Sequence, residues 1–367
     1  MEIIGIIAEY NPFHNGHLYH INKIKKMYPK SILIAVINGY FLQRGEVSII
    51  PKYAKAKIAL NSKVDIVISL PSLYGTQSAD NFADASIKLL NHLGCKKIIF
   101  GSECNDIEKL KKIACKSLAL EKDKNVKENL KSGINYPTVL SKLINEDFNY
   151  NPNDLLGICY IKSIIKNNFD ITPITIQRTN DYLDKESNEK IVSALNIRSK
   201  IKNNEDISKF LPSYSKNEII KVNQNLLFNL IKITILNNDI SDILDVDLSL
   251  NNKLKKVIKN VNSYEMLINS LKSKKYTYNK INRMLIHILL NIKKDDANNK
   301  ITYINILGFN KTGKNYLNSI KSNLDVSLKK DKNSKCFDIE YKSSIIYDML
   351  TNLNEQKKEL ENRPIIF

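Results

Sequence analysis

The segment EYNPFHNGHLYH, residues 9–20, decides the predicted fold of this chain. It overlaps IIGIIAEY (residues 3–10), an apolar run typical of the buried strands of parallel sheets. A turn containing Asn11 and Pro12 follows, and residues 17–28 have the pattern of a helix. The free N–H groups and the dipole of a helix start favour a phosphate. The sequence therefore predicts a phosphate site between the first strand and the first helix.

Three of the five histidines of the chain fall in this segment: His14, His17 and His20. His14 and His17 are three residues apart, so they share one face of the first helical turn. Two imidazoles beside a phosphate can donate hydrogen bonds to a reacting phosphoryl group. Gly16 has no Cβ and lets a nucleotide approach the backbone. Capping or surface histidines are the alternative, but their clustering at a strand-to-helix switch favours the phosphate role.

Strands and helices alternate over the first half of the chain. Further strands are predicted at residues 31–39, 64–71, 95–102 and 171–179. Helices are predicted at residues 51–61 and 79–93 and from residue 152, with a lysine-rich helical pattern at 106–150. This alternation predicts an α/β fold with a Rossmann-like, doubly wound parallel sheet. Ligands of such sheets bind beyond the carboxyl ends of the strands.

The character of the sequence changes after about residue 201, where Leu and Ile recur at helical spacing. We therefore predict two domains: residues 1–200, which bind the nucleotide and carry catalysis, and residues 201–367, a mainly α-helical, basic domain. The formal net charge of +18 favours a polyanionic partner such as RNA. A codon bias towards Lys, Asn and Ile is the competing explanation for part of this charge.

The best candidate RNA surface lies in the second domain. Basic residues alternate there with tyrosines, which suits phosphate pairing and base stacking: Lys274, Lys275, Tyr276, Tyr278, Lys280 and Arg283. The apolar run that follows, MLIHILL (residues 284–290), has the pattern of core.

The composition also limits the classes of protein to consider. No apolar run reaches the ~18–20 residues of a membrane span, and the first residues lack a basic leader, so we expect a cytoplasmic protein without membrane contact. The five cysteines show no CxxC spacing, which favours free thiols over a zinc site.

Several motifs, in their order along the chain, resemble those of a known protein family. HNGH after the first strand resembles the HxGH signature of the HIGH nucleotidyltransferase superfamily. Together the following motifs resemble the tRNA(Met) cytidine acetate ligase family over nearly the whole chain: EYNPFHNGHLYH, NGYFLQRGE (38–46), VDIVISLP (64–71), FGSE (100–103), PNDLLG (152–157), KKYTYNKINRMLIHIL (274–289) and YINILGFNKTGKNYL (303–317).

The resemblance implies a two-step reaction. Acetate and ATP, with Mg²⁺ expected beside the triphosphate, give acetyl-adenylate and pyrophosphate. The exocyclic amine of the wobble cytidine in elongator tRNA(Met) then takes the acetyl group, which yields N4-acetylcytidine and AMP. The oligomeric state is not predicted.

The resemblance also implies site residues. ATP lies along the first segment, with His14 and His17 on the phosphates and contacts from Ile7, Glu9, Tyr10, Asn11, Pro12, Phe13, Gly16 and His20. Gly101 leaves room for a base or ribose, and Arg178 ends a strand where its guanidinium suits phosphate. Asn153 is either an ATP contact or only a helix cap. Arg44 either neutralises phosphate, holds acetate or forms a surface salt bridge.

One motif departs from the superfamily. SALNIR (residues 193–198) looks like the counterpart of the second HIGH signature, ISTxxR or SxTxxR, but Leu195 and Asn196 stand where hydroxyl residues are expected. Ser193 and Arg198 remain candidates for phosphate binding. Two other functions therefore stay open: a HIGH enzyme that activates a different small carboxylic acid, and a non-catalytic nucleotide- and RNA-binding protein.

Overall fold

The computed structural model describes residues 1–121, 151–178, 190–361 and 363–367. The predicted lysine-rich helix is described as α5 (Ile107–Leu120), and its remainder lies outside the described residues.

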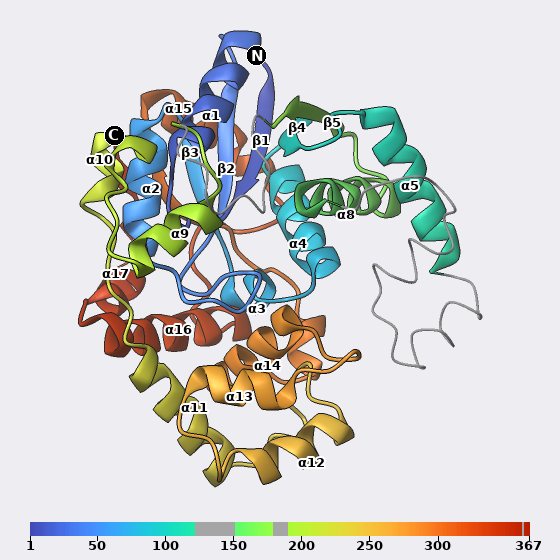
Figure 1. Ribbon diagram of the computed structural model, residues 1–367. Coiled ribbons are helices and arrows are strands. Elements are labelled where there is room, and N and C mark those ends of the chain that lie inside the picture. The colour runs from blue at the N-terminus through green and yellow to red at the C-terminus, as the bar shows by residue number, and fades with distance from the viewer. Residues whose placement is uncertain (122–150, 179–189, 362) are drawn as a thin grey trace.

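A sheet of seven strands in the described residues forms the centre of the molecule, in the order β5-β4-β1-β2-β3-β6-β7 (Figure 1). The first five strands pair in parallel: β1 (Ile3–Ala8), β2 (Ile32–Asn38), β3 (Ile66–Leu70), β4 (Lys97–Ser102) and β5 (Thr172–Gln177). Each falls inside a segment predicted as a strand. The structure thus confirms the predicted α/β class and the parallel core.

Strand β2 shows why the sheet is covered on both faces. Successive side chains of a strand point to opposite faces, and every residue of β2 is buried. Ile32, Ile34 and Val36 pack into one hydrophobic cluster, and Leu33, Ala35 and Ile37 into a second. The second cluster includes residues of α1 (Asn15–Met27) and α2 (Lys52–Asn61), and the first includes residues of α4 (Ala79–His92), α5 and α8 (Pro152–Lys166).

Two helix ends follow from local chemistry. Gly94 comes after α4 with φ +70°, a conformation that favours glycine, and α4 ends within one residue of the helix predicted at 79–93. Pro51 was expected at the first helical position of α2, but it is the cap residue and α2 begins at Lys52.

The C-terminal half adds two strands that the sequence analysis did not predict. Strand β6 (Asn305–Phe309) pairs antiparallel with β3, and β7 (Ile365–Ile366) pairs with β6. Both are short, so their apolar residues do not stand out from helical core. The boundary near residue 200 stays a prediction, but the sheet takes strands from both sides of it.

The remaining C-terminal elements are mostly helices, as expected. They are α9 (Ala194–Lys202), α10 (Ser213–Lys216), α11 (Gln224–Asn237), α12 (Leu248–Val257), α13 (Tyr264–Leu271), α14 (Tyr278–Leu290), α15 (Lys311–Ile320), α16 (Lys335–Thr351) and α17 (Glu355–Glu361). Helices α11 to α14 gather below the sheet in Figure 1, near the short helix α3 (Ser72–Gly75). None of the described helices has the length and apolar character needed to cross a membrane.

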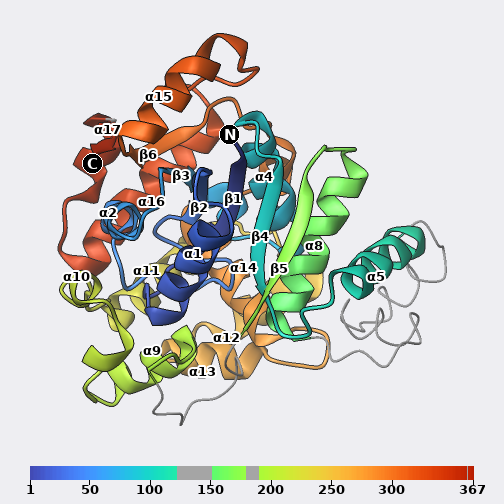
Figure 2. The same ribbon diagram turned by 90° about the horizontal axis from the view of Figure 1, so that it is seen from above.

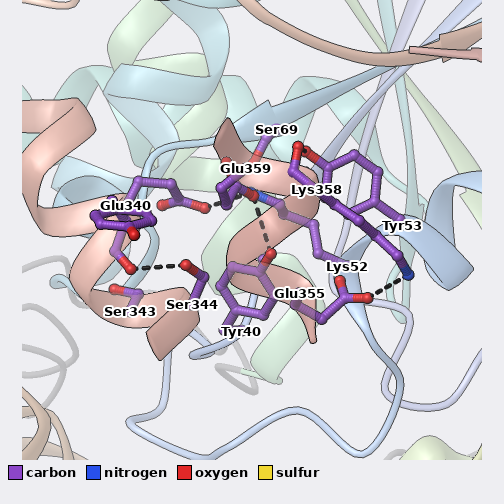
Figure 3. A network of polar contacts seen from close by, with 12 residues as sticks. Tyr40, Lys52, Tyr53, Ser69, Glu340, Ser343, Ser344, Glu355, Lys358 and Glu359 are labelled. Carbon is purple, nitrogen blue, oxygen red and sulfur yellow. Dashed lines mark hydrogen bonds and ion pairs between the residues drawn. The ribbon is translucent and has the colours of Figure 1, made fainter. Parts of the chain in front are cut away.

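A buried charge network joins α16 and α17 to the start of α2 and to the loop that precedes it (Figure 3). Lys52 at the start of α2 forms ion pairs with Glu340, at 2.7 Å, and with Glu359. Lys330 pairs with the other oxygen of Glu359 at 2.8 Å, and the Tyr40 hydroxyl donates to Glu359 at 2.9 Å. We call these five residues the Lys52 network. Because Tyr40 and Lys52 lie at the two ends of loop 39–51, the network fixes where this loop starts and stops.

Candidate functional site

A cleft opens at the carboxyl ends of β1, β4 and β5, as expected for such a sheet. Thirteen of the predicted catalytic and nucleotide-binding residues line it: Ile7, Glu9, Tyr10, Asn11, His14, Gly16, His17, His20, Arg44, Gly101, Asn153, Arg178 and Arg198. Three predicted residues do not appear in this lining: Pro12, Phe13 and Ser193. Phe13 is fully buried in the core, and the Ser193 side chain caps α9 by accepting the Asn196 N–H.

The start of α1 fixes the two imidazoles. His14 is the cap residue, and its Nδ1 accepts the Gly16 N–H at 3.0 Å. The His17 Nδ1 accepts the His14 N–H at 3.2 Å. A neutral imidazole carries its single proton on the other nitrogen, so both rings bear it on Nε2. The local backbone thereby leaves each ring one N–H donor for a ligand.

The histidines are held in the neutral form. Burial lowers the pKa of His14 to about 3, and the positive charges of Arg178 and Arg198 act in the same direction. Burial also lowers the pKa of His17 well below its ordinary value, followed by the effects of His14, Arg178 and His20. The pKa of His20 falls to about 4, again mainly through burial. At neutral pH these rings act as hydrogen-bond donors and add no charge.

The positive charge of the cleft comes from arginines. Arg198 donates to the Asn11 carbonyl at 2.8 Å and pairs with Glu46 at 3.2 Å. Arg178 lies over Gly101, where an added Cβ would be 3.3 Å from its side chain, and its Nε is 3.7 Å from Glu103. The two arginines contact different elements of the lining, Arg178 beside β4 and Arg198 beside Asn11 and loop 39–51, which suits an extended polyanion.

Reciprocal hydrogen bonds join the residues after β4 to the start of α8, beside the cleft. The Glu103 carboxylate accepts the Asn153 side-chain amide at 2.5 Å and the Asp154 N–H at 3.0 Å. The Asp154 carboxylate in turn accepts the Ser102 hydroxyl and the N–H groups of Glu103 and Cys104. Asn153 is not the cap of α8, because Asn151 occupies that position and the Asn153 side-chain amide donates to Glu103 instead. The motifs FGSE and PNDLLG form one unit.

Loop 39–51 also lines the cleft, through Gln43, Arg44 and Glu46. Gly45, between them, has φ +76°, and an added Cβ would lie 2.3 Å from the backbone of Asn282 in α14. Only glycine fits this crossing. The loop that carries Arg44 thus rests directly on the helical half of the chain.

One protein family matches almost the whole chain. The HIGH Nucleotidyl Transferase family matches it over residues 1–363. This chain belongs to the HIGH nucleotidyl transferase family. A protein of Fusobacterium nucleatum subsp. nucleatum called tRNA(Met) cytidine acetate ligase is 37% identical over 89% of this chain and 87% of its own length. A protein of the same name from Clostridium novyi is 36% identical over 100% of this chain and 99% of its own length.

Solved structures agree with the sequence comparison. The apo form of Thermotoga maritima TmcAL superposes with a TM-score of 0.88 at 27% identity and covers 100% of both chains. The same protein bound with alpha-thio ATP gives a TM-score of 0.86 at 26% identity, over 100% of this chain and 99% of that one. The expected resemblance to tRNA(Met) cytidine acetate ligases is confirmed.

Several lining residues of this family member were missed in the sequence analysis. Phe82 of α4, Phe100 of β4 and Leu156 and Tyr160 of α8 form an apolar wall. Each lies in an apolar pattern that also describes core, so the sequence contains no signal that separates them. Gln43 and Glu46 were noted only as neighbours of Arg44.

The predicted RNA surface is corrected in part. Lys274, Lys275 and Tyr278 are exposed, and Lys280 is half-buried. The prediction of a stacking ring is wrong for Tyr276, which is only 4% exposed and donates its hydroxyl to Asp247 at 2.8 Å. Arg283 has a side chain that is 14% exposed and paired with Asp245. Both side chains contact acidic residues just before α12, and the sequence pattern does not reveal these contacts.

Metal-binding and thiol chemistry add little to the site. The described residues contain no group of three or more His, Cys, Asp or Glu side chains able to hold a metal ion. All five cysteines are free thiols, and burial raises the pKa of Cys95 and Cys159.

Proposed function

We propose that this chain is an ATP-dependent acetate ligase. It forms acetyl-adenylate and transfers the acetyl group to N4 of the wobble cytidine of elongator tRNA(Met), releasing AMP and pyrophosphate. One observation carries the proposal: two neutral imidazoles at a helix start, each with its proton on Nε2, line the same cleft as Arg178 and Arg198. The full-length similarity to relatives named for this activity supports the choice of substrates.

The first step needs positioning and charge stabilisation. An acetate oxygen attacks the α-phosphorus of ATP, and pyrophosphate leaves as negative charge grows on the phosphoryl oxygens. In our proposal His14 and His17 donate to these oxygens, and Arg178 and Arg198 neutralise the rest of the triphosphate. Gly101 and Asn153 border the base or ribose. We expect Mg²⁺ to arrive bound to ATP, because the described residues offer no carboxylate cage for it.

The second step needs the anticodon beside the cleft. Lys272, Lys274 and Lys275 are exposed just before α14, and α14 touches loop 39–51 at Gly45. A tRNA backbone held by these lysines would have its bases close to the loop that lines the cleft. The proposal therefore assigns RNA positioning to the helical half.

The decisive experiment is mass analysis of nucleosides after incubating the protein with ATP, acetate and total tRNA. N4-acetylcytidine in elongator but not initiator tRNA(Met) is the expected product. Acetate-dependent exchange of pyrophosphate into ATP without any acetylated nucleoside would instead indicate a HIGH enzyme with another acceptor. Absence of exchange with acetate and other small acids would favour a non-catalytic binding protein.

A further inference from the structure

The corner of the cleft between β1, β4 and α8 combines a carboxylate with an aromatic wall. Glu9, which follows β1, lines it together with the rings of Phe82, Phe100 and Tyr160. The rings of Phe100 and Tyr160 meet edge to face with centroids 5.6 Å apart. We call these four residues the Glu9 corner.

The Glu9 carboxylate is fixed through one of its oxygens. Oε1 accepts both the Gln43 N–H at 2.8 Å and the Asn38 side-chain amide at 3.1 Å. Within the described residues, Oε2 has no hydrogen-bond partner. The protein thus orients the group rigidly and leaves an acceptor available to a ligand.

Tyr160 offers the complementary donor. It is 4% exposed, yet its hydroxyl has no hydrogen-bond partner in the part of the chain that the structure describes. The hydroxyl oxygen itself is not fully buried, so it can reach a ligand in the cleft. Burial raises the pKa of Tyr160, and the nearby Cys159 and Glu9 add to this, so the hydroxyl keeps its proton.

The chemistry of the corner fits a cytosine. The exocyclic amine of cytosine donates hydrogen bonds, whereas its N3 and O2 accept them, and its flat ring suits an aromatic wall. Acetate carries no donor and would face the negative Glu9. The position also fits, because β1 lies between β4 and β2 in the sheet. If the base and ribose of ATP lie over β4 and β5, its α-phosphate lies at His14 and His17. The Glu9 corner then lies next to that phosphate.

We propose that the Glu9 corner binds the acceptor cytosine, with N4 donating to Oε2 of Glu9 and the Tyr160 hydroxyl donating to N3 or O2. This inference rests on the proposed function. The N4 lone pair attacks the acetyl carbonyl carbon, the bond from that carbon to the AMP oxygen breaks, and AMP leaves with the electron pair. The proton lost by N4 passes to Oε2 of Glu9 and then to water.

Two variants test this assignment in two assays: acetate-dependent pyrophosphate exchange without RNA, and acetyl transfer to tRNA(Met). Glu9→Gln keeps an amide oxygen for Gln43 and Asn38 but turns the outer position from an acceptor into a donor. We expect transfer to fall at least tenfold more than exchange. A tRNA with uridine in place of the acceptor cytidine should compete at least fivefold better against Glu9→Gln than against wild type. Tyr160→Phe should also reduce transfer more than exchange.

Tyr341→Phe, a half-buried tyrosine of α16 outside the cleft, is the matched control and should match wild type in both assays. Equal losses in exchange and transfer, or an unchanged preference for cytidine over uridine, would overturn the assignment. A raised KM for acetate in the exchange assay would place acetate in the corner and also overturn it. If wild type exchanges pyrophosphate but acetylates no tRNA, the proposed function itself fails, independently of these variants.

Discussion

Loop 39–51 connects two groups of charged side chains that differ in burial and in how closely each charge is paired. In the Lys52 network every charge is buried and faces an opposite charge, with side chains 0–2% exposed. In the cleft, Arg178 and Arg198 keep side chains that are 25% and 20% exposed and pair with glutamates at 3.7 and 3.2 Å.

The difference separates a structural role from a binding role. Buried charges are tolerated when paired, and removing one partner leaves an uncompensated charge. Partly exposed arginines beside neutral histidines still have hydrogen-bonding capacity for a polyanion. The Lys52 network fixes the two ends of loop 39–51, and the middle of this loop lines the cleft.

The largest effect is expected in the network. Lys52→Met leaves Glu340 and Glu359 with only Lys330 between them, so the free energy of unfolding should fall by about 3–5 kcal/mol. Urea unfolding measures it. Lys96→Met is the control, because its pair with Asp170 is exposed and should change stability by less than about 1 kcal/mol.

A double variant that also removes the excess negative charge left by Lys52→Met tests whether charge balance determines stability in the Lys52 network. Lys52→Met combined with Glu340→Gln restores charge balance and keeps an oxygen for the Ser72 N–H, which Glu340 accepts at 2.7 Å. We expect this double variant to be more stable than Lys52→Met alone. A double variant that is less stable would show that charge balance is not what matters there.

In the cleft, His17→Ala should lower acetate-dependent pyrophosphate exchange about 100-fold or more while the protein stays folded. The substitution removes one Nε2–H donor and the acceptor of the His14 N–H. His92→Ala, at the end of α4 and outside the cleft, is the control. Exchange near the wild-type rate in His17→Ala would contradict the role of this imidazole.

A smaller effect is expected at the RNA surface. Replacing Lys272, Lys274 and Lys275 with alanine should weaken tRNA binding and reduce the slope of log affinity against log salt, by up to ~0.7–0.9 for each phosphate that a lysine no longer neutralises. Lys311 and Lys314 of α15, at the other end of the molecule in Figure 1, form the control pair. An equal weakening from the control pair would mean that tRNA binding is not specific to the α13–α14 turn.

The smallest effect concerns pH. The pKa of His20 is lowered to about 4 and its Nε2 is buried without a partner. Between pH 6.5 and 4 the unfolded state binds more protons at this residue, so its contribution to stability is present above pH 6.5 and is lost as pH falls towards 4. His20→Gln should therefore flatten the dependence of unfolding free energy on pH. Figure 2 shows α1, which carries His20, beside β1 and β2.

Much of this molecule follows from local sequence. The continuous apolar run of β2 predicts a strand buried on both faces, and the glycine after α4 predicts where that helix ends. The His14-Asn15-Gly16-His17 stretch predicts a phosphate-binding helix start because cap geometry depends on neighbouring residues only.

Tertiary structure decided the rest. The partners of Lys52 are about 300 residues away in sequence, and nothing in the sequence distinguishes Lys52 from the many other lysines of the chain. Tyr276 was expected at the surface and Tyr160 was not singled out, yet packing buried the first and brought the second to the cleft. A strand or cap depends on a few adjacent residues, whereas burial and pairing depend on which distant elements the chain brings together.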